Sequence, residues 1–238
     1  MIEINTNFNM YHDAKGKDPD TYSYTLHSYH HFLWNKLLPN GNRFKLDSIG
    51  DYKYHLLYSD DKFNLKLSSD SIIHPYHYFK TMQHIITKIN PKDIENFHHV
   101  GATIGGYIIF PSEKIDNKAT INTVRGFHPM IKDRFDFTLE CIRRYYIGQN
   151  SPLYEHLSRY KNFFDLFIDF KGYVDFFLLN DLVDEDYNIE FWLPFIDFER
   201  TKALPKDINE YNLYMNHVIE FVKLRNKRIL SWVKSQQK

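Results

Sequence analysis

The sequence has little cysteine, no excess of charge of either sign and no long apolar run. Cys141 is the one cysteine among 238 residues, so neither an intramolecular disulfide nor a thiolate metal cage can form, which favours a reducing compartment. Lys plus Arg and Asp plus Glu both number 30, which argues against binding nucleic acid or an anionic membrane through bulk charge. No apolar stretch reaches the ~20 residues of a membrane span, and residues 1–10 lack a basic and apolar leader. We therefore expect a soluble, cytoplasmic protein that does not bind membranes.

The motifs of several familiar enzyme classes are absent too. The chain has no Gly-x-Gly-x-x-Gly or Gly-x-x-x-x-Gly-Lys loop for nucleotide phosphates, no Gly-x-Ser-x-Gly elbow and no His-Glu-x-x-His zinc motif. His27, His30 and His31 have a spacing that could suit a transition metal, but a hydrogen-bonded core residue is the favoured interpretation of His30. We predict no metal site, and the sequence leaves any cofactor unknown.

Aromatic residues, in contrast, are abundant. Twenty Phe, 18 Tyr and three Trp make up 17% of the chain. Each ring removes on the order of 150–250 Å² from water when it is buried, so we expect a core built mainly from rings. The lack of a linker, an internal repeat or a low-complexity segment predicts a single globular domain over residues 1–238.

The periodicity of apolar residues predicts an α+β fold with an antiparallel sheet packed against several helices. Helical spacing is found at 19–37, 76–89, shortly after 91, and at 129–147, 152–170, 173–183 and about 207–233. Alternating or β-branched segments predict strands at 43–46, 52–58, 63–67, 102–110, 120–124 and 189–195. Strands 102–110 and 120–124 should pair as a hairpin, and the chain should end in a long helix.

Distinctive runs of residues occur along almost the entire chain. They are Gly16-Lys17-Asp18-Pro19-Asp20, Leu38-Pro39-Asn40-Gly41, Ser68-Ser69-Asp70, Thr103-Ile104-Gly105-Gly106, Thr120-Ile121-Asn122 with Arg125-Gly126, and the segments 133–146 and 172–183. Together they resemble an uncharacterised bacterial family, a domain of unknown function. The resemblance implies that the whole chain is one unit, and it supplies no activity.

Charged residues that could carry chemistry concentrate between positions 120 and 144. The predicted strand and the helix after it present Asn122, Arg125, Asp133, Glu140 and Arg143. An arginine beside carboxylates could bind a phosphate or carboxylate group bidentately, while one acid serves as a general base. The simpler interpretation is a solvated helix face, on which Glu140 pairs with Arg143 and Arg144 at spacings of three and four.

Three further features stand out. Lys17 lies in a charged N-terminal loop that could enter a site, and Asp70 follows a predicted strand in the run Ser68-Ser69-Asp70. Gly105-Gly106 interrupts a predicted apolar strand. Glycines at such a position mark a bulge, or a place where a ligand or another backbone segment comes close, and close packing of the backbone is the favoured explanation.

Two classes of function follow from these residues. The first is an enzyme acting on a phosphate-bearing small molecule or a nucleotide. In this enzyme Arg125 and Arg143 would bind the anion, and Asp133 or Glu140 would be the acid or base. His30 or Asn122 would orient the reacting groups. The second is a non-catalytic interaction protein of a toxin, defence or stress system, which recognises protein or single-stranded nucleic acid through aromatic stacking. A shared concave pocket would favour the first, and an exposed aromatic patch the second. The sequence does not determine the oligomeric state.

Overall fold

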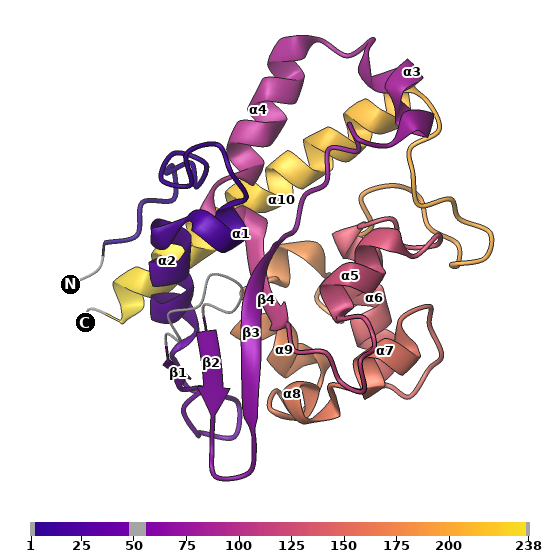
Figure 1. The fold of residues 1–238 in the computed structure, drawn as a ribbon. Helices are drawn as coiled ribbons and strands as arrows, with labels where there is room; N and C mark the ends of the chain where they lie inside the picture. Colours follow the sequence, from indigo (N-terminus) through magenta and orange to yellow (C-terminus); the bar gives the residue numbers. More distant parts are fainter. Residues whose placement is uncertain (1–2, 48–55, 237–238) are drawn as a thin grey trace.

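The computed structural model describes residues 3–47 and 56–236, which form an α+β fold around a four-stranded antiparallel sheet (Figure 1). The strands are β1 (Leu46–Asp47), β2 (Leu56–Ser59), β3 (Asn64–Ser71) and β4 (Tyr107–Pro111), and they pair in the order β1-β2-β3-β4. The predicted antiparallel strand at 63–67 corresponds to β3, whereas the one predicted at 43–46 overlaps β1 only at Leu46, and Arg43 makes an isolated bridge with Leu37. The strand predicted at 52–58 corresponds to β2, although its residues 52–55 lie outside the described part of the chain.

Helices make up most of the rest of the described chain. They are α1 (Pro19–Tyr22), α2 (Tyr24–Trp34), α3 (Gln83–Ile86), α4 (Pro91–Gly101), α5 (Ile121–Phe127), α6 (Phe135–Tyr146), α7 (Tyr154–Ser158), α8 (Lys161–Asp165), α9 (Phe170–Phe176) and α10 (Ile208–Ser235), with 3₁₀ turns η1 (Lys80–Met82), η2 (Ile104–Gly106) and η3 (Asn180–Leu182). No helix among these is both long and apolar enough to cross a membrane.

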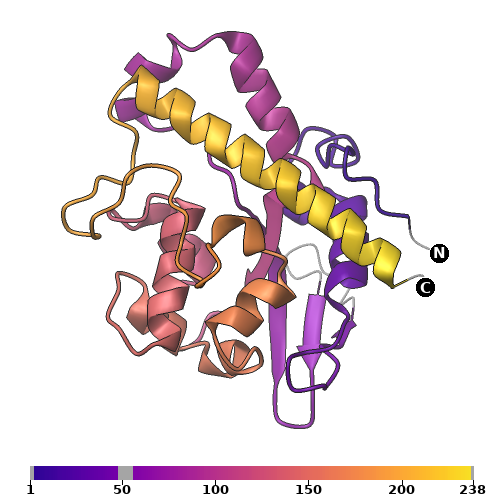
Figure 2. The same cartoon turned by 180° about the vertical axis from the view of Figure 1, so that it is seen from behind.

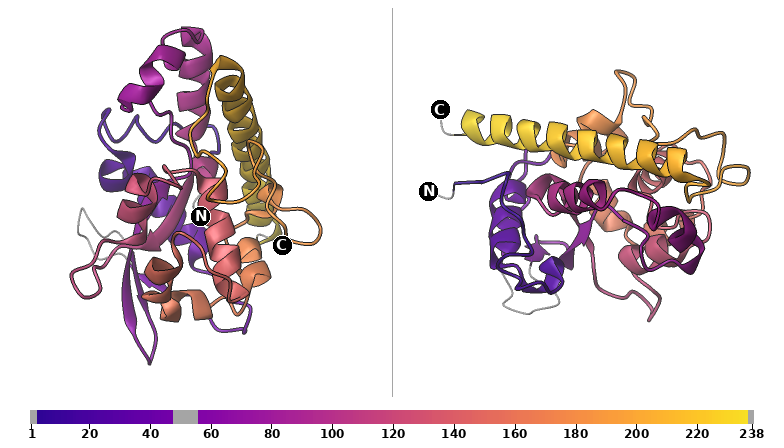
Figure 3. Two further views of the ribbon diagram at one scale, coloured as in Figure 1. Left: turned by 90° about the vertical axis from the view of Figure 1, so that its right-hand side faces the viewer. Right: turned by 90° about the horizontal axis from the view of Figure 1, so that it is seen from above.

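The long C-terminal helix α10 is confirmed, and it ties the fold together. Asp207 caps its first turn by accepting a hydrogen bond from the Glu210 N–H. Seen from behind, α10 runs diagonally across the molecule, from beside α3 at one end, past α4, toward both chain termini at the other end (Figure 2). The side and top views show it lying along one side of the body, so it covers segments distant in sequence (Figure 3). Its inward face buries Tyr211, Tyr214, Met215, Val218, Phe221, Val222, Ile229 and Val233.

The aromatic core expected from composition is present. Phe163, Phe167, Tyr173 and Phe177 are fully buried, and their rings lie in mutual contact at centroid distances such as 4.9 Å between Tyr173 and Phe177. Trp34 of α2 joins this cluster, with its ring centroid 5.2 Å from that of Phe177. Edge-to-face and tilted contacts of this kind stabilise a core beyond the area that they bury.

Two predicted strands were wrong. Residues 120–124 begin helix α5 and form no hairpin with β4. The Thr120 hydroxyl accepts a hydrogen bond from the Thr123 N–H and so caps a helix, although several residues of this segment are β-branched. Residues 189–195 make only an isolated bridge between Val183 and Ile189. Pro194 within that run cannot donate a ladder hydrogen bond, which works against a strand.

Several predicted helices are shorter than expected. The helix predicted from Pro19 is split at Ser23, whose hydroxyl accepts from the Leu26 N–H and caps α2. The helix predicted at 129–147 begins only at Phe135, after a turn in which Lys132 and Asp133 adopt positive φ angles of 46° and 61°. The regions 76–89, 152–170 and 173–183 each hold short helices joined by turns.

Gly105 lies where the backbone comes close to α10, so the packing explanation is confirmed. Its N–H donates to Asn226 Oδ1 at 2.9 Å, and a Cβ at this position would lie 2.7 Å from the Val222 carbonyl oxygen. Arg225, fully buried beside it, donates to the carbonyls of Gly105 and Tyr107 at 2.9 and 2.7 Å. The 3₁₀ turn before β4 is thereby joined directly to the C-terminal helix.

Replacement of Gly105 should therefore separate these elements. Gly105→Ala places a methyl group against backbone, and we expect it to lower the free energy of unfolding by about 2 kcal/mol, or Tm by roughly 4–8 °C. Gly126→Ala is the matched control, because the nearest atom to its Cβ is 4.0 Å away and alanine favours helix α5 by about 0.5–1 kcal/mol. Thermal unfolding of both variants tests this, and equal stability of Gly105→Ala and the parent would contradict it.

Candidate functional site

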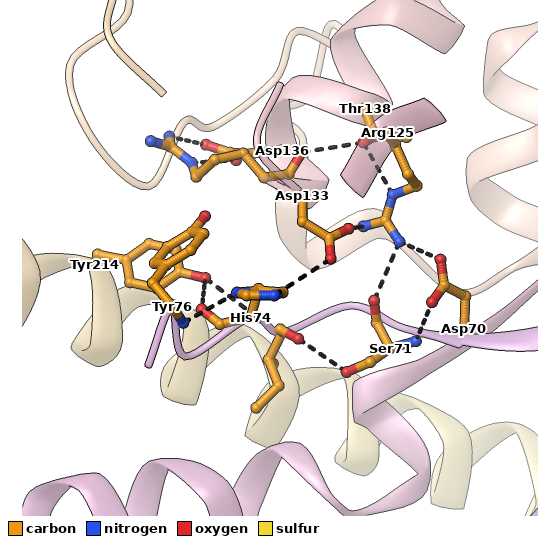
Figure 4. Close-up of polar contacts among 11 residues, drawn as sticks. Asp70, Ser71, His74, Tyr76, Arg125, Asp133, Asp136, Thr138 and Tyr214 are labelled. Carbon is orange, nitrogen blue, oxygen red and sulfur yellow. Dashed lines mark hydrogen bonds and ion pairs between the residues drawn. The ribbon is translucent and has the colours of Figure 1, made fainter. Parts of the chain in front are cut away.

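Arg125 is the centre of a polar cluster between the sheet and α6 (Figure 4). Its side chain is fully buried, and its Nη1 donates to the Asp70 carboxylate and, at 3.2 Å, to the Ser71 carbonyl. Its Nη2 lies 3.2 Å from Asp133 Oδ1, and its Nε donates to Thr138 Oγ1 at 3.3 Å. Two carboxylates therefore flank one guanidinium, and both are about one-fifth exposed, so solvent or a ligand can reach them.

Local structure explains how these side chains meet. Asp70 stands near the end of β3, paired with Ile108 of β4, and its Oδ1 accepts from the Ser71 N–H at 2.9 Å. After α5 the chain turns back, and the Asp133 N–H donates to the Arg125 carbonyl at 2.9 Å. Asp133 has a φ of 61°, a left-handed conformation that aspartate tolerates better than most residues. The turn thus directs the Asp133 carboxylate toward the Arg125 side chain.

His74 extends the cluster from the segment after β3. Its Nδ1 accepts from the Tyr76 N–H at 3.0 Å, so in the neutral ring the proton resides on Nε2, which faces Asp133 Oδ2 at 3.8 Å. The Tyr214 hydroxyl of α10 donates to the His74 carbonyl at 2.9 Å and fixes the backbone. Burial lowers the pKa of His74, with Asp133 opposing and Arg125 adding to the effect, so the neutral imidazole is favoured.

The carboxyl groups of Asp70 and Asp20 are poor acids in this environment. Burial raises the pKa of Asp70 to about 6; Arg125 lowers it and Asp133 raises it, but desolvation dominates. Burial together with the charges of Asp70 and Asp18 raises the pKa of Asp20 well above its usual range. Asp20 Oδ1 is also buried without a hydrogen-bond partner. In both carboxyl groups the environment therefore favours the protonated form more than it does in an ordinary aspartate.

A hydrogen-bonded chain runs from Trp34 of α2 to Ser69 of β3, next to Asp20. Trp34 Nε1 can only donate, and it lies 2.8 Å from His30 Nδ1, which must therefore accept. His30 Nε2 then carries the proton and donates to Ser69 Oγ at 2.8 Å, and the Ser69 side chain is close enough to Asp20 to lower the pKa of that carboxyl group. His30 is fully buried, so it is a hydrogen-bonded core residue, and it approaches the cluster through Ser69.

The remaining sequence candidates lie outside this cluster. Glu140 of α6 is bound by its helix neighbours Arg143 and Arg144, each Nε being 2.7 Å from a carboxylate oxygen, as the simpler interpretation expected. That pairing is nevertheless buried at Glu140, which is only 3% exposed. Asn122 on α5 has a buried Oδ1 without a hydrogen-bond partner, and Lys17 is exposed with its Nζ 4.9 Å from the ring centroid of Tyr22.

The charged face expected on α6 is largely internal. Asp136 is fully buried, and it is paired with Arg134 through Nε at 2.7 Å. Arg134 thus neutralises the charge of Asp136 inside the protein. Among the residues that the structure describes, no group of three or more His, Cys, Asp and Glu side chains is placed to hold a metal ion.

Comparison with known proteins gives a family and no activity. A family model described as a family of unknown function (DUF6994) matches residues 4–229. The chain belongs to this family. The match covers nearly the whole chain, as the resemblance noted from the sequence implied. No curated protein and no solved structure matches the chain, so the chemistry of the site has to be argued from its geometry.

Sequence reasoning identified Arg125, Asp133 and Asp70 singly but not their convergence. Arg125 and Asp70 are 55 positions apart, and only the end of β3 brings them together. His74 and Asp20 were not assigned to the site from the sequence. No local pattern predicts such a pairing, although an acidic residue without a capping role is a reason to look at Asp20.

The raised pKa of Asp70 has a consequence for stability. A folded pKa of about 6 against an unfolded value of about 3.9 means that the folded state binds more protons between these pH values. The stability that Asp70 contributes is therefore greatest below pH ~4 and is lost as the pH rises through 6, by roughly 3 kcal/mol in total, of which roughly 2 kcal/mol is lost above pH ~4.

Urea unfolding of the parent and of Asp70→Asn from pH 4 to 7.5 measures this effect. The difference in unfolding free energy, parent minus variant, should fall by roughly 2 kcal/mol across that range, because asparagine cannot ionise. Lowered histidine pKa values affect both proteins alike and cancel in the difference. A difference that stays constant or rises with pH would show that Asp70 has an ordinary pKa.

Proposed function

We propose that this protein is an enzyme that uses Asp70 and Asp20 for general acid–base catalysis on a neutral, hydroxyl-bearing ring compound such as a glycoside or nucleoside. The observation that supports the proposal is the pair of carboxyl groups with raised pKa values beside the Arg125–Asp133 ion pair. Environments that push the pKa values of neighbouring acids apart are a recurrent feature of acid–base catalytic sites.

The two acids have separate roles in this proposal. Asp70, with a pKa of about 6, is largely ionised at pH 7 and can accept a proton from water or from a substrate hydroxyl. Burial and the charges of Asp70 and Asp18 raise the pKa of Asp20 and favour its protonated form, so we assign it the role of the acid that donates to a leaving group. Arg125 holds the Asp70 carboxylate in position, and the Ser69 side chain lies close to Asp20. Hydrolysis of a glycosidic bond needs such an acid and such a base.

The surroundings favour an uncharged ring over a bare phosphate. Two carboxylates already bind the Arg125 guanidinium, and Asp20 lies close enough to interact with it electrostatically, so a phosphate here meets repulsion instead of a free cation. Tyr11 and Tyr78, 43% and 84% exposed, lie close enough to interact electrostatically, and Tyr11 also interacts with Asp20. An exposed ring near Asp20, such as that of Tyr11, can stack on a sugar or a base. A nucleotide would have to bind with its phosphate directed away from the carboxyl groups.

Variants of the two acids test the proposal directly. Hydrolysis of chromogenic aryl glycosides and of nucleosides would be assayed for the parent, Asp70→Asn and Asp20→Asn. We expect kcat to fall by about 10²–10⁴-fold in each variant, with KM much less affected, because general acid–base groups contribute on that scale. The acidic limb of the parent's pH–rate profile should have an apparent pKa of about 6.

Two controls separate this site from α6. Asp165→Asn removes an exposed carboxylate paired with Lys161 and should leave the rate unchanged. Glu140→Gln tests the acid suggested by the sequence; a rate loss there as large as in Asp70→Asn would move the catalytic centre to α6. Carbon-13 NMR titration of the Asp carboxyl carbons needs no substrate, and ordinary pKa values for both Asp70 and Asp20 would refute the proposal.

The interaction-protein alternative rests on exposed rings. Tyr24, Tyr78 and Phe127 are each at least 80% exposed, but they belong to α2, to the segment before η1 and to α5. Two further exposed rings lie elsewhere: Tyr11 is near Asp20, and Tyr22 contacts Lys17. An enzyme that binds a ring compound near Asp20 would therefore account for part of the exposed aromatic surface as well.

A further inference from the structure

A cleft lies between the segment after α2 and helix α9. Its volume is about 460 Å³, within the range of small-molecule pockets. Its apolar walls come from Leu37, Leu38, Pro39, Ile168, Phe176 and Trp232. The exposed fractions of Leu37 and Ile168, 62% and 60%, are high for aliphatic side chains, and both residues face this cleft. The site thus offers an apolar surface to a ligand.

Lys36 lines the cleft and is enclosed by rings. Its Nζ lies 5.0 Å from the ring centroid of Trp34, 4.7 Å from that of Phe176 and 4.8 Å from that of Trp232. No ion pair of Lys36 is found among the described residues. The amine is therefore held among ring faces, with no carboxylate as a direct partner.

Lys171 lines the same cleft and provides a contrast. It is 60% exposed, its Nζ lies 2.9 Å from an Asp175 carboxylate oxygen, and it also donates to the Tyr187 hydroxyl. These hydrogen bonds raise the pKa of Lys171. Burial lowers the pKa of Lys36 to about 7, the charge of Arg225 adds to the lowering and Asp175 opposes it. The ring faces also oppose the lowering, because they favour the ammonium form.

Arg225 cannot relieve this repulsion by moving away. Its guanidinium is fully buried and donates to the carbonyls of Gly105, Tyr107 and Phe177 at 2.7–3.0 Å. Its Cζ lies 5.9 Å from the ring centroid of Trp34, the ring that also contacts Lys36. A fixed positive charge and an apolar wall are the two conditions that make a lysine amine nucleophilic.

We propose that this cleft binds a small aldehyde or ketone with an apolar body, and that Lys36 forms an imine with its carbonyl carbon. The neutral amine attacks the carbonyl carbon to give a carbinolamine. The carbonyl oxygen then takes up protons and leaves as water, so one amine, one carbonyl and one proton from solvent yield one iminium ion and one water molecule. The iminium retains a positive charge at Nζ, where the three ring faces stabilise it.

Reductive trapping tests the proposal on the intact protein. The chain would be incubated with butanal and cyanoborohydride at pH values from 6 to 10, and modified lysines would be quantified by peptide mass spectrometry. At pH 7 we expect Lys36 to be modified at least tenfold faster than Lys171, since a larger fraction of Lys36 is neutral. The rate at Lys36 should level off at a lower pH than the rate at Lys171.

Variants and a direct titration complete the test. Lys36→Arg keeps the charge but cannot form an imine, so labelling at this position should vanish while Lys171 reacts as before. The nitrogen-15 shift of the Lys36 amine should titrate well below that of Lys171. Modification of Lys36 no faster than that of Lys171, or titration of Lys36 at the ordinary lysine value, would mean that the rings hold a permanent ammonium, and the proposal would be overturned.

Discussion

A guanidinium without access to water is the constraint on which the candidate site depends. Arg125 is fully buried, and burial lowers its pKa, but the charges of Asp133 and Asp70 outweigh that effect and raise it. The cation therefore persists and fixes two carboxylates that would otherwise repel each other. Removing one partner of such a buried ion pair lowers the free energy of unfolding by about 3–5 kcal/mol. The fold itself therefore determines the positions of Asp70 and Asp133, without a bound ligand.

The same logic recurs at two other arginines of the ring-rich core. Arg134 is buried against Asp136 and also donates to the Ala203 carbonyl at 3.0 Å, while Arg225 is buried against carbonyl groups alone. Phenylalanine rings offer no hydrogen-bond acceptors, so each of these cations draws together backbone or carboxylate oxygens from distant segments. The arginines thus link elements that apolar packing alone leaves free to slide, such as η2 and α10.

Sequence reasoning predicted the fold class, the antiparallel pairing and the long final helix, because each rests on a local period or cap. It failed at Thr120, where a single capping hydroxyl outweighed a β-branched run, and at residues 152–183, where short helices and turns interrupt a continuous apolar pattern. At the site it found Arg125 and Asp133, eight positions apart. The partners Asp70 and His74 could not be paired with them, since β3 and α5 are brought together only by tertiary packing.

Trp34 contacts both proposed sites. Its indole N–H donates to His30, which determines the proton position along the chain to Ser69, and its ring face contacts the Lys36 amine. Because the indole N–H has no acceptor capacity, it forces His30 Nδ1 to accept, and the proton at Nε2 must then point toward Ser69. A shift of this ring would change the hydrogen bond that orients His30 toward Ser69 and the enclosure of Lys36 together. The packing of Trp34 against Phe177 in the aromatic core, with ring centroids 5.2 Å apart, thus holds both His30 and the rings around Lys36 in fixed positions.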